Sequence, residues 1–267
     1  MTDDQTLRHG SCLCGAVAFE TVGPLRPVIA CHCGQCRKVS GHYWSATSVP
    51  HDRFKLTRDE GLAWFRSSAT ATRGFCNMCG AALFWQPEGE ARLSISPAAF
   101  DDDPGVVVGE HIFTEDGGDY YAPEGPPPAM AAGGPDRLSC SCLCGAVAFS
   151  LPGPAGPVIA CHCRQCRKLS GHYSASFDAD ETQVRWDRRD GLAEYATPGG
   201  GRRGFCRDCG SSLWFRAADG GFSVEAGAVD GPTGGRLAEH IFTAFKGSYY
   251  ILDDGLPQSP GDGLPPT

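Results

Sequence analysis

The chain carries the same seven-cysteine pattern twice, and this repeat limits its possible folds more than any other feature. A shift of 130 residues aligns the two halves, and 26 of the 33 positions from Ser11 to Tyr43 are identical to those from Ser141 to Tyr173. A repeat of this length is too long for a solenoid unit and predicts a duplicated domain. Of the 15 cysteines only Cys140 has no counterpart, and we expect it to be a free thiol.

The sequence predicts two domains joined by a linker. Residues 123–139 are rich in Pro, Gly and Ala and show no periodic apolar pattern, which is typical of a linker. We therefore place the first copy at residues 1–122 and the second copy at residues 140–256. Residues 257–267 are expected to form a disordered tail. A unit of about 120 residues is long enough to bury its own core.

Short runs of β-branched residues between Gly and Pro predict a mainly β fold. The candidate strands of the first copy are 16–19, 27–30, 43–49, 53–57, 62–66, 82–86 and 92–96. Their counterparts in the second copy include 174–177, 182–186, 192–196 and 212–216. The one predicted helix in each copy is short and follows the cysteine cluster, from Gln35 to Ser40 with Gly41 closing it in the first copy. The tryptophans are expected in the core: Trp44, Trp64, Trp85, Trp186 and Trp214.

Charge and cysteine usage favour a cytoplasmic metalloprotein. The formal net charge of −8 argues against nucleic acid or an anionic membrane as a partner. We find no apolar signal core at the start of the sequence and no apolar run of the about 20 residues needed to cross a bilayer. Disulfides are rare in the reducing cytoplasm, so the clustered cysteines favour zinc over a disulfide framework.

The seven cysteines of each copy divide into a four-Cys set and a three-Cys set. Two pairs from distant turns, CxC and CxxC, have the pattern of a closed structural zinc site. The four-Cys sets are Cys12, Cys14, Cys76 and Cys79, and Cys142, Cys144, Cys206 and Cys209. The three-Cys sets are Cys31, Cys33 and Cys36, and Cys161, Cys163 and Cys166. A three-Cys set is either a second structural site closed by a further ligand or a catalytic zinc with an exchangeable position.

The order of three motifs resembles a known family. The motifs are Ser-Cys-Leu-Cys-Gly-Ala-Val, then Cys-His-Cys-x-Gln-Cys-Arg-Lys-x-Ser-Gly, then Gly-Phe-Cys-x-x-Cys-Gly. They resemble the glutathione-dependent formaldehyde-activating enzyme family, which includes centromere protein V, over residues 10–122 and 140–256. The resemblance implies a zinc-bearing, mainly β fold of the Mss4-like, β-tent type in each of two tandem domains.

The same resemblance implies a reaction and its ligands. The four-Cys sets would hold structural zinc and the three-Cys sets catalytic zinc, which gives about four zinc ions per chain. The reaction implied is the condensation of formaldehyde with glutathione as co-substrate to S-hydroxymethylglutathione, a carbon–sulfur lyase reaction run backwards. Cys31, Cys33 and Cys36, and likewise Cys161, Cys163 and Cys166, would then be the catalytic ligands.

Cations near the three-Cys sets are candidates for binding the two carboxylates of glutathione. These cations are Arg37, Lys38 and Arg73 in the first copy and Arg167, Lys168 and Arg203 in the second. The alternative is that they are solvated charges that balance the thiolates. His32 and His162 are expected to form hydrogen bonds behind the ligands, and His111 and His240 to be packing residues.

Two other functions remain compatible with the sequence. A non-catalytic zinc-stabilised binding module would have a fourth protein ligand on the three-Cys set, and a thiol or redox sensor would lose its metal on mild oxidation. The expected partners are a small-molecule thiol and a carbonyl substrate, with no nucleic acid and no membrane. The tandem copies are expected to pair as an intramolecular pseudo-dimer. Their loops at 52–72 and 178–202 differ, which leaves open whether both copies act on one substrate.

Overall fold

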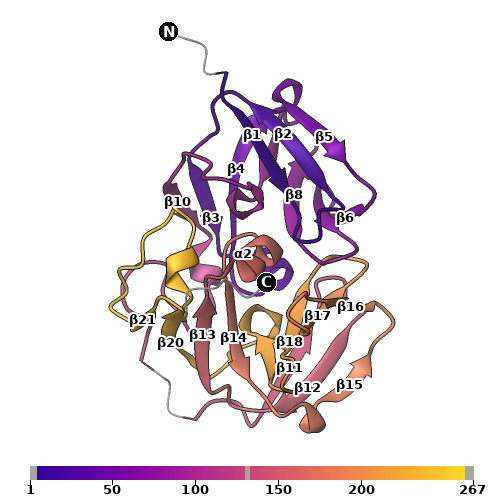
Figure 1. Cartoon of the computed structure of the whole chain (residues 1–267). Helices are drawn as coiled ribbons and strands as arrows, with labels where there is room; N and C mark the ends of the chain where they lie inside the picture. The colour runs from indigo at the N-terminus through magenta and orange to yellow at the C-terminus, as the bar shows by residue number, and fades with distance from the viewer. Residues whose placement is uncertain (1–4, 130–132, 262–267) are drawn as a thin grey trace.

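The computed structural model describes residues 5–129 and 133–261 and consists mainly of β-strands (Figure 1). One arrangement occurs twice along the chain, since each copy contains a three-stranded sheet, a larger sheet and one short α-helix. The predictions of a mainly β fold and of two tandem domains are therefore confirmed. The described part of the chain contains no helix that is both long and apolar enough to span a membrane.

The first copy consists of a three-stranded sheet and a seven-stranded sheet. The small sheet has the order β1-β2-β5: β1 (Leu7–Ser11), β2 (Ala18–Val22) and β5 (Phe54–Arg58). The large sheet has the order β10-β3-β4-β9-β8-β7-β6. Its strands in chain order are β3 (Val28–Cys31), β4 (Trp44–Pro50), β6 (Leu62–Ser68), β7 (Ala71–Cys76), β8 (Ala82–Pro87), β9 (Arg92–Ile95) and β10 (Val108–Ile112). All neighbours are antiparallel except β10 and β3, which run parallel.

The second copy repeats this plan and adds a strand at one edge. Its small sheet has the order β11-β12-β15: β11 (Arg137–Ser141), β12 (Ala148–Pro152) and β15 (Arg185–Arg188). Its eight-stranded sheet has the order β16-β17-β18-β19-β14-β13-β20-β21. These strands are β13 (Pro157–Cys161), β14 (Ser174–Asp178), β16 (Leu192–Ala196), β17 (Arg202–Cys206), β18 (Ser212–Arg216), β19 (Phe222–Glu225), β20 (Arg236–Ile241) and β21 (Gln258–Ser259).

A short helix follows the first strand of each large sheet. Helix α1 (Gly34–Ser40) ends at Gly41, whose φ of 83° suits glycine and whose N–H donates to Arg37 O at 2.9 Å. Helix α2 (Arg164–Ser170) ends in the same way at Gly171. The predicted helix and its glycine stop are therefore confirmed, with the first helix starting one residue earlier than expected.

Three expectations about element boundaries need correction. The strand predicted at 182–186 begins only at Arg185, the first residue of β15. The residues before it form a 3-10 turn, in which Asp180 accepts a hydrogen bond from Thr182 N at 2.9 Å. The predicted linker is too long, because β11 begins at Arg137. The predicted disordered tail is wrong at Gln258–Ser259, which pair with β20 as β21, while residues 262–267 lie outside the described residues. The strands β1, β7 and β10 were not among the predicted ones.

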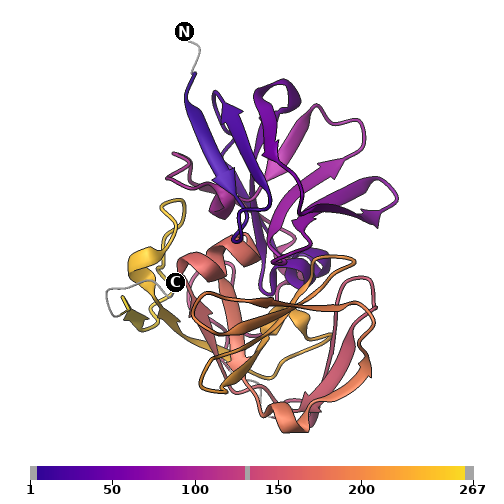
Figure 2. The ribbon, with the colours of Figure 1, turned by 45° about the vertical axis from the view of Figure 1, so that its right-hand side comes forward.

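The two copies pack against each other through their cysteine-bearing helices, which lie at the junction in Figure 2. Val108 N donates to Tyr249 O and Leu237 N donates to Tyr120 O, both at 2.8 Å, so the backbone contacts are reciprocal. Val28 of the first copy belongs to the same buried apolar cluster as much of the second copy's core. The copies therefore share part of one core.

Candidate metal and substrate site

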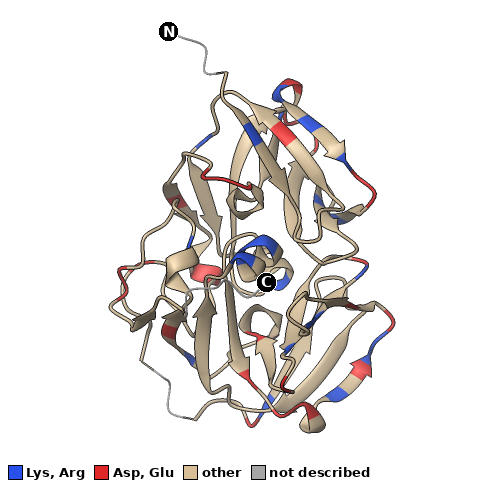
Figure 3. Cartoon of the chain, in the orientation of Figure 1, with Lys and Arg blue, Asp and Glu red and all other residues tan. Residues whose placement is uncertain are grey.

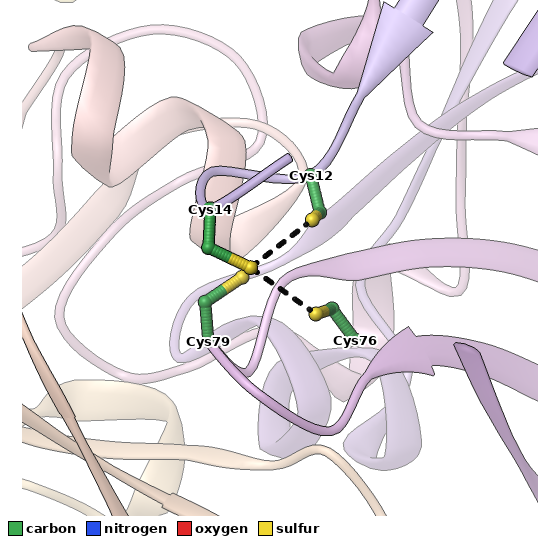
Figure 4. Close-up of side chains that lie close together, drawn as sticks. All are labelled: Cys12, Cys14, Cys76 and Cys79. Atoms are coloured by element: carbon green, nitrogen blue, oxygen red, sulfur yellow. Dashed lines mark hydrogen bonds between the residues drawn. The ribbon is translucent and has the colours of Figure 1, made fainter. Parts of the chain in front are cut away.

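Four cysteine side chains converge in each copy at the turns after the first strand and after β7 or β17. In the first copy the Sγ atoms of Cys12, Cys14, Cys76 and Cys79 all lie within 4.8 Å of one another (Figure 4). Cys14 Sγ lies 3.5 Å from Cys12 Sγ and 3.7 Å from Cys76 Sγ. Four thiolates at about 2.3 Å from a zinc ion would be about 3.8 Å apart, so this set fits tetrahedral zinc.

Backbone turns hold these sulfurs in place. Gly80 has φ 79° and donates its N–H to Cys76 O at 2.8 Å, which closes the CxxC turn. Hydrogen bonds from Cys76 and Cys79, together with the N–H of Val17, lower the pKa of Cys12 to about 2. The second copy repeats the arrangement, with sulfur separations of 3.5 and 3.7 Å among Cys142, Cys144 and Cys206; Cys209 completes its set.

The three-Cys set of the first copy forms where β3 passes into α1. Cys31 ends the strand, Cys33 precedes the helix and Cys36 lies in its first turn, and their sulfurs lie within 4.8 Å of one another. Hydrogen bonds from Cys31 and Cys36 lower the pKa of Cys33 to about 2. The matching set of the second copy is equally compact and contains Cys161, Cys163 and Cys166. Among the described residues, neither set gains a fourth Cys, His, Asp or Glu ligand.

All fifteen cysteines are free thiols, so no disulfide competes with these four groups. Cys140 lies in none of the groups and is 1% exposed. Burial raises the pKa of its thiol to about 12. The expectation of a free thiol at this position is confirmed.

His32 is directed away from the sulfurs. Its Nδ1 lies 2.7 Å from Tyr121 Oη and its Nε2 lies 2.9 Å from His111 Nδ1, so both ring nitrogens are occupied. Burial, the largest cause, lowers the pKa of His32 to about 4 and keeps the ring neutral. The second copy repeats the arrangement with His162, Tyr250 and His240. His111 and His240 line a separate cavity of about 640 Å³ at the junction, which no cysteine borders.

One predicted cation in each copy reaches its three-Cys set. Arg73, on β7, donates from Nη2 to Cys36 Sγ at 3.5 Å, and Arg203, on β17, donates to Cys166 Sγ at 3.2 Å. Both arginines are largely buried. Each arginine therefore offsets negative charge on the sulfurs beside it.

The predicted lysines lie elsewhere. Lys168 is 3% exposed and donates from Nζ to Ser11 O and Ala99 O, both at 2.9 Å, in the other copy. Lys38 makes the reciprocal contacts and donates to Ala228 O at 2.7 Å and Ser141 O at 3.0 Å. These lysines hold the copies together, which does not fit the predicted contact with glutathione. Figure 3 shows α2 at this junction with its Lys and Arg residues in blue.

The other two predicted cations, Arg37 and Arg167, do not contact the three-Cys sets through a shared cavity. Arg37 is absent from the wall of the cavity described below. Arg167 borders a smaller cavity of about 220 Å³, whose wall includes Lys246 and contains no cysteine. Arg73 and Arg203 are therefore the two predicted cations that the fold brings to the three-Cys sets.

A cavity of about 650 Å³ borders the three-Cys set of the first copy. Its wall includes Cys31, Cys33 and Cys36 together with Arg26, Arg73, Trp44 and Trp85. The expectation that the tryptophans belong to the core holds for Trp44 and Trp214, which are buried, and is wrong for Trp64, which is 45% exposed. Trp44 and Trp85 also line this cavity. Sequence analysis missed Arg26. The signal available was a difference between the copies, because Gly156 stands at the matching position.

The surroundings of the second three-Cys set differ in composition. Ser174 stands where the first copy has Trp44, and Glu225 stands where it has Ser96. Glu225 is 2% exposed, accepts a hydrogen bond from Ser174 Oγ at 2.7 Å and places Oε1 3.9 Å from Arg203 Nη1. Burial raises the pKa of Glu225 to about 8, against the opposing effect of Arg203.

Both copies match known proteins in sequence. Residues 7–116 and 137–244 each match the glutathione-dependent formaldehyde-activating enzyme family. A Schizosaccharomyces pombe protein described as an uncharacterized lyase is 25% identical over 114 residues, which cover 42% of this chain and 82% of that protein. A crystal structure of a Rhodobacter sphaeroides protein is 25% identical over 35% of this chain and 87% of its own, with a TM-score of 0.31. Because the family match covers most of the sequence, the chain belongs to the glutathione-dependent formaldehyde-activating enzyme family and contains two tandem domains of it.

Proposed function

We propose that the chain is a zinc-dependent lyase of the carbon–sulfur type. It would join, or in reverse release, a glutathione-type thiol and formaldehyde or a similar small carbonyl compound. The family and the relative described as a lyase support this class of reaction. The observation that carries the proposal is the cavity of about 650 Å³ beside Cys31, Cys33 and Cys36. A purely structural metal site needs no such cavity, whereas a small-molecule site does.

The four-Cys sets would hold structural zinc, and the three-Cys sets would hold zinc with one ligand position left for substrate. A zinc ion there would supply a thiophilic Lewis acid that favours the thiolate form of an incoming thiol at neutral pH. Side chains of the first copy would supply charge balance and an apolar wall. Arg73 offsets the negative charge of the sulfurs through its hydrogen bond to Cys36, while Trp44 and Trp85 give the cavity an apolar wall.

The proposed reaction balances without an oxidant or reductant. In the joining direction the sulfur–carbon bond forms while the π electrons of the carbonyl group move to its oxygen. The proton lost by the thiol ends on that oxygen and yields the hydroxymethyl group. In the reverse direction the sulfur–carbon bond breaks, its electron pair returns to sulfur, and the carbonyl group re-forms.

The test is the rate at which zinc-loaded protein forms S-hydroxymethylglutathione from ¹³C-formaldehyde and glutathione, followed by NMR against the uncatalysed rate. We expect clear acceleration by the wild-type chain and its loss when Cys31→Ala and Cys161→Ala are combined. Cys140→Ala is the matched control, because Cys140 is a free thiol outside all four sets. A fully zinc-loaded wild-type chain without acceleration, or a double variant that keeps it, would refute the proposal.

A further inference from the structure

We propose that the first copy alone binds a thiol that carries carboxylates, through Arg26 and Arg73, and that the second copy excludes it. The inference rests on the proposed function, whose site it assigns to one copy and one substrate class. It depends on a difference between the two copies in the charged side chains beside their three-Cys sets.

The first copy holds two arginines with no carboxylate partner at its cavity. Arg26 donates from Nη2 to Ala46 O at 3.0 Å, and Arg73 donates to Cys36 Sγ and to Gln35 Oε1. The Nε atoms of both arginines are buried without a hydrogen-bond partner, and neither residue forms an ion pair within the described residues. Arg26 is half-buried and has only a backbone carbonyl as acceptor, and Arg73 has only Gln35 and the Cys36 sulfur, so a ligand carboxylate would be bound favourably here.

The second copy has one arginine beside its three-Cys set instead of two, and this arginine has a carboxyl group near it. Gly156 replaces Arg26, so one cation is missing. The carboxyl group of Glu225 lies 3.9 Å from Arg203, where a ligand carboxylate would otherwise lie, and Ser174 holds it there. Arg203 also stacks on the Phe215 ring, with its guanidinium carbon 4.4 Å from the ring centroid. The chain's own side chains therefore occupy the surroundings of this arginine.

The substitutions between the copies form a matched set. In the first copy Ser96 takes the place of Glu225 and donates from Oγ to Gly171 O at 2.8 Å, which leaves Arg73 without a carboxyl group. Trp44 takes the place of Ser174, the residue that holds Glu225, and its ring lies 6.0 Å from the Arg73 guanidinium carbon. One copy is thus built with an internal carboxyl group and the other without one.

The charges around the first cavity indicate the class of ligand. Besides the two arginines, the wall contains one carboxylate, the exposed Asp116 at the rim. Apart from the cysteine sulfurs, which would hold the metal, the two cations and one carboxylate complement a thiol that bears two carboxylates and one ammonium group, as glutathione does. The second copy has Phe245 at the position of Asp116, so it lacks the charges of Arg26 and Asp116, and the carboxyl group of Glu225 lies beside its remaining arginine.

Binding of S-methylglutathione to the full-length, zinc-loaded chain tests the inference without requiring any reaction. This probe keeps both carboxylates but has no free thiol. Titration calorimetry should give one binding site per chain. Arg26→Gly, which gives the first copy the residue of the second, should weaken binding by roughly 10-fold or more. The matched exchange Gly156→Arg should leave both affinity and stoichiometry unchanged.

Two sites per chain, no binding at millimolar probe, or an Arg26→Gly variant of unchanged affinity and zinc content would overturn the inference. The stoichiometry of the wild-type chain decides the assignment to one copy even where a variant folds poorly. Failure of the proposed function gives a different result, namely arginine-dependent binding without any acceleration of adduct formation. Conversely, equal acceleration with glutathione and with 2-mercaptoethanol would support the lyase and refute the carboxylate site.

Discussion

Single residues distinguish the two copies most clearly beside their three-Cys sets. The cysteines themselves follow from spacing, because CxC and CxxC place sulfurs on tight turns whatever lies around them. Arg26 and Glu225 could not be predicted in the same way. Glu225 lies against Gly41 of the other copy, where an added Cβ would come within 2.8 Å of its Oε2. Its role depends on packing between residues far apart in the sequence.

The buried carboxyl group of Glu225 predicts a pH-dependent stability. Burial raises its folded-state pKa from 4.5 to about 8, although Arg203 and the Ser174 hydrogen bond oppose this effect. A raised carboxyl pKa contributes stability that is complete below the unfolded-state value and is lost as pH rises through about 8. Between about pH 6 and pH 9 the wild type should therefore lose roughly 2–3 kcal/mol of unfolding free energy that Glu225→Gln keeps. Urea denaturation of both proteins across this range measures the difference, and parallel curves would contradict it.

Elements were predictable where a local signal marks them. The glycine after each cysteine helix gives its end correctly, because Gly41 and Gly171 adopt positive φ there. The strand β10 gave no such signal, since its partner β3 lies about eighty residues earlier and the two pair in parallel, Val108 with Val28. Strand β21 depends in the same way on an edge that β20 provides.

The contact of α2 with the other copy predicts a large effect from one lysine. Lys168 Nζ is buried and donates to Ser11 O, Ala99 O and Asp101 Oδ1, the last at 2.6 Å. Lys168→Met keeps the apolar stem but removes the hydrogen-bonded cation from Asp101 and the donor from the carbonyl groups of Ser11 and Ala99, and should cost about 3–5 kcal/mol of unfolding free energy. Arg164→Ala on the same helix is the control, because Arg164 is exposed and lies 4.0 Å from Asp101, beyond hydrogen-bond distance. Its cost should stay within about 1 kcal/mol, and similar losses in the two variants would refute the buried contact.

At the scale of the whole molecule, each copy supports the metal-binding turns of the other. Lys168 binds the carbonyl group of Ser11, directly before Cys12, and Lys38 binds that of Ser141, directly before Cys142. The repeat predicts the duplication and its two sets of cysteines. It does not predict these reciprocal contacts, because lysines are usually solvent-exposed and their partners lie in the other copy, far away in the sequence.

Metal removal should separate the two kinds of cysteine set. The zinc-loaded chain should contain about four zinc ions, of which the two in the three-Cys sets have one fewer protein ligand. A mild chelator should therefore release about two ions while the far-ultraviolet circular dichroism is retained, and the other two only as the chain unfolds. Zinc release is followed with a colorimetric indicator on the same sample. A total near two ions, or release of all four together with unfolding, would contradict this division.

The central claim is that the three-Cys set of the first copy keeps a ligand position for a substrate thiol. The most direct measurement is titration of the cobalt-substituted chain with glutathione, with the sulfur-to-cobalt charge-transfer absorption as the readout. We expect the absorption to rise by the amount of one added sulfur ligand, to saturate at one glutathione per chain, and to stay constant in Cys31→Ala. A wild-type spectrum that saturating glutathione leaves unchanged would contradict the claim.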